Sequence, residues 1–304
     1  MFFSVGSLQL DQAFFRTHVA VDRGLRVFAA ERRGVTFRTR FVPASRAPKR
    51  NVVVLWFIVS GWAAWEGQNE VAGNRRRAHG KTLVLLSESA FDGAEGKREF
   101  QLVSSGQPFV GIEVRLPGTL AMGDASRGPV VLTASEAAWA AVERYIARVL
   151  VPGRTTSAAF VLELLGELAK EGLVKPEAAN LVVTDEDPRM THIWDATAEA
   201  YERFDTRPTL KRVADACDMS LRNLSRFIDL AYNDLLLPSA GWREMSTNLR
   251  LMIAILFLSC PSLSIAQVAD AVGYGHAQAM ANAFKRAGVP APRDIQAYRD
   301  DTFT

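Results

Sequence analysis

The sequence has 304 residues, of which 48% are hydrophobic, and its formal net charge is +3. This apolar content excludes a disordered chain, and the length favours at least two domains with separate cores. The longest apolar runs have eight residues each and begin at Val52 and Leu251, whereas a membrane span needs about 20. The first residues lack the basic and apolar regions of a secretory signal, so we expect a cytoplasmic protein without a membrane partner.

Metal and disulfide chemistry find little support in the sequence. The two cysteines, Cys217 and Cys260, and the four scattered histidines show no metal-ligand spacing. We therefore expect no metal, no cofactor and no catalytic residue. A metal-dependent enzyme would need clustered His and carboxylate ligands, so it is the weakest interpretation of this sequence.

Residues 1–117 show the period of β-strands. Alternate residues of the run from Val110 to Leu116 are apolar, and glycines separate this run from similar ones. The pattern predicts a β-sandwich or barrel. Three tryptophans, Trp56, Trp62 and Trp65, suit the wall of a small-molecule pocket, although core packing explains them equally well.

Residues 118–187 change to the helical period. Thr133 and Glu136 suggest a capping box at the start of one helix. A second helix should have the apolar stripe Phe160, Val161, Leu164, Leu165 and Leu168 and end near Gly172. The two helices form a predicted connector, which either covers the sheet or meets the same pair in a second copy of the chain.

Residues 188–304 are predicted to be entirely helical, with Asp187 as the N-cap of the first helix, and they contain one motif twice. "VADACDMS" begins at Val213 and "VADAVGYG" at Val268. Each copy reads as a helix, a short turn at Asp218 or Gly273, and a second helix, which is a helix-turn-helix unit. The units should cover about 209–230 and 264–287. The apolar segment between them predicts a buried linker helix at about 242–259.

The second helix of each unit has a predicted buried face. In the first unit Ser220 is the expected N-cap, and the buried residues should be Leu221, Leu224, Phe227 and Ile228. In the second unit the helix should start near Gly275 and bury Met280, Ala283 and Phe284. The exposed faces then remain for a ligand.

With these motifs the segment from about Arg189 to Arg299, above all "SIAQVADAVGY", resembles the DNA-binding domain of the AraC/XylS family of bacterial transcription regulators. The resemblance implies an α+β multidomain protein with an N-terminal cupin-like effector domain at 1–117, the connector at 118–187 and the DNA-binding domain at 188–304. It also implies double-stranded DNA, an unknown small-molecule effector, a second copy of the chain in a homodimer, and RNA polymerase as partners.

Transferred through this resemblance, the base-reading positions fall on both second helices. The first helix contributes Arg222, Asn223, Ser225 and Arg226, and the second contributes His276, Gln278 and Asn282. Arginine pairs with guanine and the amides pair with adenine, so these side chains suit the major groove. The first helix, which carries the two arginines, should be the main specificity element.

The charge balance leaves an alternative open. Residues 189–304 contain 13 Lys+Arg and 13 Asp+Glu, although a DNA-binding domain is usually basic. In addition, the second reading helix is rich in alanine, and the spacer between the units is longer than the family pattern. The alternative is a protein-interaction module of the same fold whose DNA binding is weakened or lost.

Overall fold

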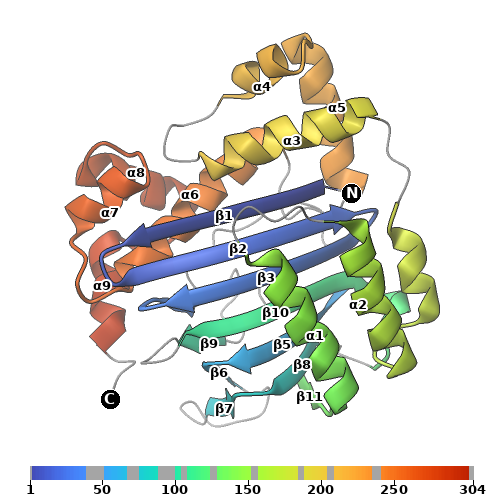
Figure 1. The fold of residues 1–304 in the computed structure, drawn as a ribbon. Coiled ribbons are helices and arrows are strands. Elements are labelled where there is room, and N and C mark those ends of the chain that lie inside the picture. The colour runs from blue at the N-terminus through green and yellow to red at the C-terminus, as the bar shows by residue number, and fades with distance from the viewer. Residues whose placement is uncertain are drawn as a thin grey trace.

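The chain adopts an α+β fold in which antiparallel β-sheets precede a helical layer (Figure 1). The computed structural model describes residues 2–38, 51–66, 75–87, 100–103, 108–123, 129–151, 157–183, 188–203, 209–234 and 241–300. Asp187, the predicted N-cap of the first C-terminal helix, lies outside these ranges. Within them no helix is long and apolar enough to cross a membrane.

The larger sheet has seven antiparallel strands in the order β1-β2-β3-β10-β5-β8-β11. Its strands are β1 (Phe2–Leu10), β2 (Ala13–Asp22), β3 (Leu25–Arg33), β5 (Val52–Ser60), β8 (Thr82–Ser87), β10 (Phe109–Pro117) and β11 (Val130–Leu132). Val114 of the central strand β10 lies opposite Val27 on one side and Leu55 on the other. The short strand β11 pairs with β8, so this sheet takes a strand from the segment assigned to the connector.

The smaller sheet has four antiparallel strands in the order β4-β9-β6-β7. They are β4 (Thr36–Arg38), β9 (Phe100–Val103), β6 (Trp62–Glu66) and β7 (Arg75–His79). A small core joins the two sheets and contains Trp56, Ala63 and Phe109. Every residue from Val52 to Ile58 is buried, because β5 faces this core on one side and the connector helices on the other.

The connector helices α1 (Glu136–Val149) and α2 (Ala158–Lys170) cover the opposite face of the larger sheet. Trp139 packs edge-on against Phe57 at 5.4 Å between ring centroids. Of the two alternatives for this helix pair, the structure thus shows the one in which it covers the sheet. Short 3-10 helices, η4 (Gly118–Leu120) and η5 (Pro176–Leu181), flank the pair.

The ends of α1 and α2 correct one prediction and confirm another. The N-cap of α1 is Ser135 rather than Thr133, because the extended backbone at Ser135 lets its hydroxyl accept a hydrogen bond from the N–H of Ala138 (3.2 Å). The predicted stop at Gly172 is confirmed by its left-handed backbone (φ 66°), which follows the last residues of α2.

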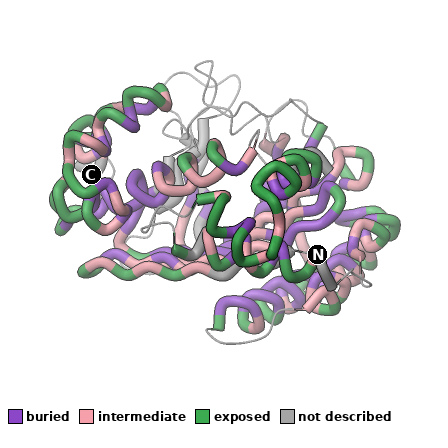
Figure 2. The backbone as a smooth tube through the Cα atoms, turned by 90° about the horizontal axis from the view of Figure 1, so that it is seen from above, coloured by how far each residue is buried: buried purple, intermediate pink, exposed green. Residues whose placement is uncertain are grey.

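The helical layer contains α3 to α9. Its helices are α3 (Pro188–Glu202), α4 (Leu210–Ala216), α5 (Leu221–Asp234), α6 (Trp242–Leu258), α7 (Ile265–Ala271), α8 (Ala277–Ala287) and α9 (Pro292–Asp300). Buried and exposed residues alternate along the helices, as expected for amphipathic segments (Figure 2). Helix α3 lies along the edge strand β1 (Figure 1).

Strand β2 shares cores with both halves of the helical layer. Near its start, Ala13 and Phe15 join the core of α6 to α9, and the Phe15 ring lies 5.8 Å from that of Phe257. At its other end, Val21 joins the core of α3 to α5. A buried hydrogen bond from the N–H of Thr36 to the hydroxyl of Ser259 (2.6 Å) also connects the sheet region to the helices.

One buried histidine links β2 to α1. His18 is fully buried, and its Nδ1 atom lies 3.5 Å from the hydroxyl of Tyr145. Burial in this apolar layer disfavours the charged ring and lowers the pKa of His18 from 6.5 to about 4. It also raises the pKa of Tyr145, so both groups are neutral at pH 7.

The packing of β2 against α6 predicts the effect of truncating Phe15. The variant Phe15→Ala should lose about 3–5 kcal/mol, because it opens a cavity in the core shared by sheet and helices. Urea unfolding measures the loss, and hydrogen exchange should show faster opening in α6 to α8. Phe14→Ala is the control, since Phe14 points to the opposite face of the same strand and is only half-buried. Equal losses in the two variants would contradict the shared core.

The burial of His18 predicts a loss of stability in acid. Between pH 6.5 and about 4 the unfolded chain binds a proton that the folded chain does not, so stability falls as the pH falls through this window. The expected loss at pH 5, relative to pH 7, is about 2 kcal/mol from this residue. Urea unfolding of wild type and His18→Gln at both pH values isolates the contribution of His18 to the pH dependence of the unfolding free energy. An unchanged pH dependence in the variant would refute it.

Candidate nucleic-acid interface

The first helix-turn-helix unit consists of α4 and α5. The hydroxyl of Thr209 caps α4 by accepting a hydrogen bond from the N–H of Arg212 (3.3 Å). Asp218 takes the predicted left-handed conformation at the turn, with φ 51°. The predicted N-cap of α5 is confirmed, since Ser220 Oγ accepts from the N–H of Asn223 (3.2 Å). Leu224 and Ile228 are then fully buried against α3 and α4.

The second unit consists of α7 and α8. Ser264 and Gln267 form a capping box at the start of α7. Gly273 makes the turn with φ 71°, and Met280 and Phe284 are fully buried as predicted. Helix α8 begins at Ala277 rather than near Gly275, because the extended His276 is its N-cap.

The two units correspond residue by residue, with one extra residue in the second turn. The first helices are offset by 55 residues, as in Ala214 and Ala269, whereas the buried residues of the second helices, Leu224 and Met280, are offset by 56. With this offset Arg222 and Arg226 correspond to Gln278 and Asn282. Both second helices therefore present long polar side chains at positions i and i+4.

A single helix, α6, belongs to the cores of both units. Its first residue, Trp242, is buried with α3 to α5, whereas Leu251 and Ile253–Leu258 are buried with α7 to α9. With 17 residues α6 is about 25 Å long at roughly 1.5 Å per residue. Successive major-groove segments on one face of DNA lie about 34 Å apart, which is the same order of length.

Arg250 of α6 was not predicted from the sequence. It holds the turn of the second helix-turn-helix unit against α6. Its guanidinium donates hydrogen bonds to the carbonyl oxygens of Val272 (3.1 Å) and Gly273 (3.0 Å). It also lies 4.2 Å from the centre of the Tyr274 ring, a cation–π distance. Arg250 therefore positions the turn that precedes α8. No pattern of spacing could identify it, because its partners lie 22 and 23 residues further along the chain.

The predicted reading residues of α5 lie on its outer surface. Arg222, Asn223 and Arg226 are exposed, and Ser225 is half-buried. Within the described part of the chain, the guanidiniums of Arg222 and Arg226 make no ion pair and no hydrogen bond. The structure thus brings these four residues together on one helix, with two cations available to an anionic ligand.

The predicted reading residues of α8 are already engaged with one another or with the backbone. Gln278 donates a side-chain hydrogen bond to Asn282 (3.1 Å), and both are exposed. His276 Nδ1 accepts from the N–H of Ala279 (3.1 Å), which leaves Nε2 to carry the proton and to face outward. His276 therefore serves as the N-cap of α8 through Nδ1, and only its Nε2 atom can contact a ligand.

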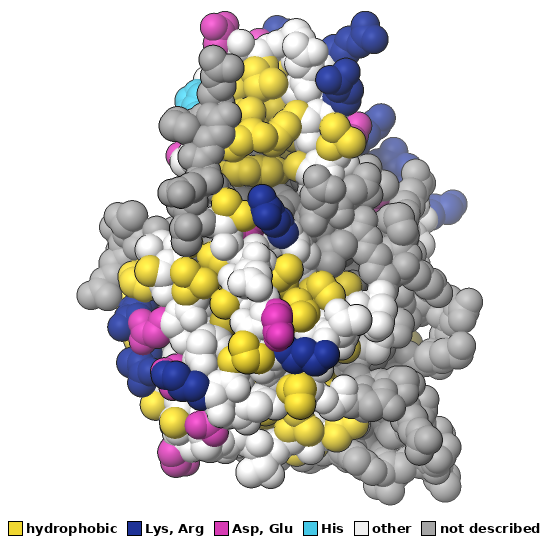
Figure 3. Space-filling model, turned by 90° about the vertical axis from the view of Figure 1, so that its right-hand side faces the viewer, with side chains coloured by type: hydrophobic (Ala, Val, Ile, Leu, Met, Phe, Trp, Pro, Cys, Tyr) yellow, Lys and Arg dark blue, Asp and Glu magenta, His cyan; other side chains and the backbone are white. Residues whose placement is uncertain are grey.

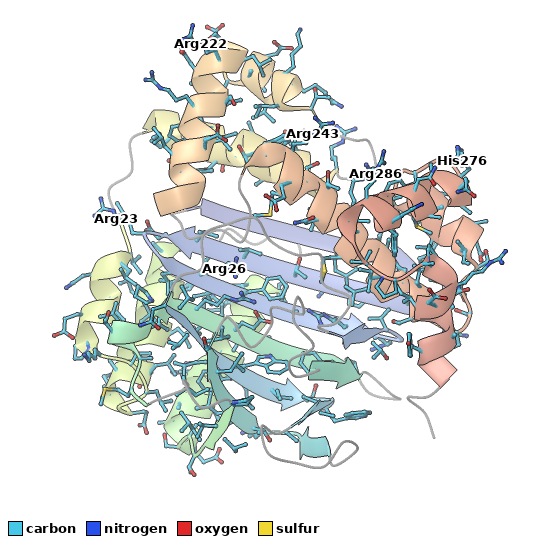
Figure 4. The ribbon with its side chains drawn as sticks, turned by 180° about the vertical axis from the view of Figure 1, so that it is seen from behind. Arg23, Arg26, Arg222, Arg243, His276 and Arg286 are labelled. Atoms are coloured by element: carbon cyan, nitrogen blue, oxygen red, sulfur yellow. The ribbon has the colours of Figure 1, made fainter. Side chains whose placement is uncertain are left out.

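Further cations that sequence reasoning did not select lie near these helices. Arg243 is exposed on the first turn of α6, and Lys285 and Arg286 are exposed on the last turn of α8. Figure 4 shows Arg222, Arg243, Arg286 and His276 following one another from α5 across α6 to α8. Some cations elsewhere in the layer are paired, as in Lys211–Asp215 (3.5 Å). Cations without an ion pair among the described residues therefore lie on this side, although residues 189–304 are neutral in sum.

The tryptophans of the N-terminal sheets occupy different environments. Trp56 is 1% exposed and packs against Phe109, with 6.3 Å between ring centroids. It therefore belongs to the core between the sheets, which was the alternative interpretation. Trp62 on β6 is half-buried, and the side chain of Trp65 lies outside the described part. Among the described residues no three His, Cys, Asp or Glu side chains gather as a metal site would require.

Comparison with known proteins gives structural likenesses only. No family model and no curated protein matches the sequence. The solved structure of ToxT from Vibrio cholerae is 11% identical, with a TM-score of 0.36, and the match covers 92% of this chain and all of that one. The AraC-like transcriptional activator CuxR is 12% identical, with a TM-score of 0.34, over 80% of this chain and 81% of that one. At these values the likeness concerns the general arrangement of the chain.

Proposed function

We propose that the chain is a DNA-binding transcription regulator whose N-terminal domain binds a small-molecule effector. The observation that carries this proposal is the duplicated unit. Two helix-turn-helix pairs flank one buried helix, and each presents exposed polar side chains at the same two positions of its second helix. This is the arrangement expected of a protein that reads two segments of the major groove.

In this proposal the two units have unequal roles. Arg222 and Arg226 have guanidiniums that suit guanine and that no other described residue engages, so α5 supplies most of the sequence preference. On α8, Gln278 and Asn282 contact the bases as one hydrogen-bonded pair of side-chain amides. Arg243, Lys285, Arg286 and the outer nitrogen of His276 contact phosphates and position the protein.

The regulatory part of the proposal rests on the domain arrangement. Two of the solved ToxT structures contain an unsaturated fatty acid or a naphthalenyl butenoic acid, and we propose a small-molecule effector for this chain as well. Because Trp56 is a core residue, Trp62 on β6 is the better candidate for a pocket wall. Dimerisation and contact with RNA polymerase remain predictions of the sequence resemblance.

A second function is favoured by one set of observations. The neutral charge of residues 189–304 and the alanines at positions 277, 279, 281 and 283 of α8 would suit a protein-interaction module that has lost DNA binding. The two experiments that follow separate this alternative from the regulator.

The first experiment removes the two free arginines of α5. A mobility-shift assay with a duplex selected from a random pool by the wild-type protein should show a loss of at least about 30-fold for Arg222→Ala with Arg226→Ala. Each arginine–guanine pair contributes about 1–3 kcal/mol, and 2 kcal/mol corresponds to roughly 30-fold. The control is Arg33→Ala with Lys175→Ala, which removes two exposed cations from the N-terminal part. If no duplex is enriched, or if both double variants bind alike, the proposal is wrong.

The second experiment measures the salt dependence of binding. Three to four phosphate contacts, from Arg243, Lys285, Arg286 and His276, predict a slope of log K against log salt between about −2.7 and −3.6, at 0.9 per phosphate. Fluorescence anisotropy from 50 to 200 mM salt, both typical assay values, provides the slope. A slope near zero would instead favour the interaction module.

A further inference from the structure

Leu221 is the first residue of α5, and the structure places it where the sequence pattern did not. The pattern assigns it to the buried face of α5, but its side chain is 49% exposed. It is also absent from the apolar core of α3 to α5, which α5 enters only from Leu224 onward. The prediction was wrong, since the burial of α5 begins at Leu224, about one turn after Leu221.

The surroundings of Leu221 are those of the reading face. Ser220, the N-cap, precedes it, Arg222 follows it, and Ser225 lies one turn further along the same helix. Figure 3 shows hydrophobic side chains gathered at the upper end of the helical layer, beside several Lys and Arg side chains. In α5, Leu221 is therefore followed directly by one of the two arginines proposed to meet DNA.

The second unit has no such group. Ala277 is the first residue of α8 and corresponds to Leu221. Its single methyl group cannot extend as far as a leucine side chain. The bulky apolar residue is thus a property of the first unit alone, as are the two arginines.

The major groove offers one apolar partner to such a side chain. Among the groups on the base edges, only the 5-methyl group of thymine is apolar. Residues at the N-terminal end of a recognition helix are those that reach base edges. A leucine at the first position of α5 has both the chemistry and the place to contact this methyl group.

We propose that Leu221 is a specificity-determining residue that contacts the 5-methyl group of a thymine next to the base pair read by Arg222. The proposal rests on the DNA-binding function proposed above, and charge complementarity argues for the occupant, because Arg222 and Arg226 lie within two turns of Leu221 on the same helix and make no ion pair with other described residues. Leu221 thereby adds apolar recognition to the hydrogen-bonded recognition by the arginines.

The experiment removes the methyl group from the DNA and the leucine from the protein. Each thymine of the selected duplex is replaced in turn by deoxyuridine, which lacks only that methyl group, and binding is measured by fluorescence anisotropy. At one thymine the wild-type protein should lose about fourfold in affinity, the ratio expected for one buried methyl-sized group. Leu221→Ala should bind the thymine duplex more weakly and should no longer distinguish it from the deoxyuridine duplex.

The matched control is Leu230→Ala, which truncates another leucine of α5 that is 60% exposed but lies more than two turns further along the helix. This variant should keep the wild-type preference for thymine. Thermal unfolding checks that both variants are folded. If no thymine shows the effect, or if Leu221→Ala keeps the preference, the inference about Leu221 is overturned while binding that depends on Arg222 still stands. If wild type binds no duplex at all, the proposed function fails first, and this inference fails with it.

Discussion

The burial of the C-terminal end of α6 is the constraint on which the arrangement of the helical layer depends. Its residues from Ile253 to Leu258 are all buried, although an amphipathic helix would expose about half of them. One side packs on α7 to α9, and the other packs on Ala13, Phe15 and Val35 of the sheet region. Because Trp242 at the opposite end is buried with α3 to α5, this helix fixes both helix-turn-helix units relative to one another.

Strand β2 provides a second connection between the same parts. It contributes Phe15 to the core of the second unit and Val21 to the core of the first. A rearrangement of either unit against the sheet would expose apolar side chains to water, at about 25 cal/mol for each Å². Contacts with the sheet therefore help to fix the distance between the two units.

The two helix-turn-helix units differ in the chemistry of their exposed side chains more than in their backbone shape. Both keep the buried pair of the first helix, Val213 and Ala214 or Val268 and Ala269, and both turn through a left-handed residue. The second helices then diverge, since α5 presents free arginines and α8 presents amides that bond to one another. Because residues 189–304 are neutral in sum, the exposed cations of α5, α6 and α8 are balanced by acidic residues of the same segment.

Local signals in the sequence identify much of this architecture. The helical period, the caps at Ser220 and Ser264, and the left-handed positions at Asp218 and Gly273 predict both units to within a few residues. These signals suffice because capping and turn formation involve residues only three or four positions apart. The positions of Arg222 and Arg226 on the exposed side of α5 follow from the same period.

The remaining features depend on segments that are distant in the sequence. Strand β11 joins the sheet beside β8, Trp56 is enclosed between two sheets, and the N–H of Thr36 bonds to Ser259 across 223 residues. Leu221 has the same helical phase as buried residues such as Leu224, yet it is 49% exposed and is not part of the core of α3 to α5. The sequence by itself determined which segments form the two units and which side chains can face outward. Only the tertiary structure decided which apolar faces are covered, because that depends on where distant segments meet.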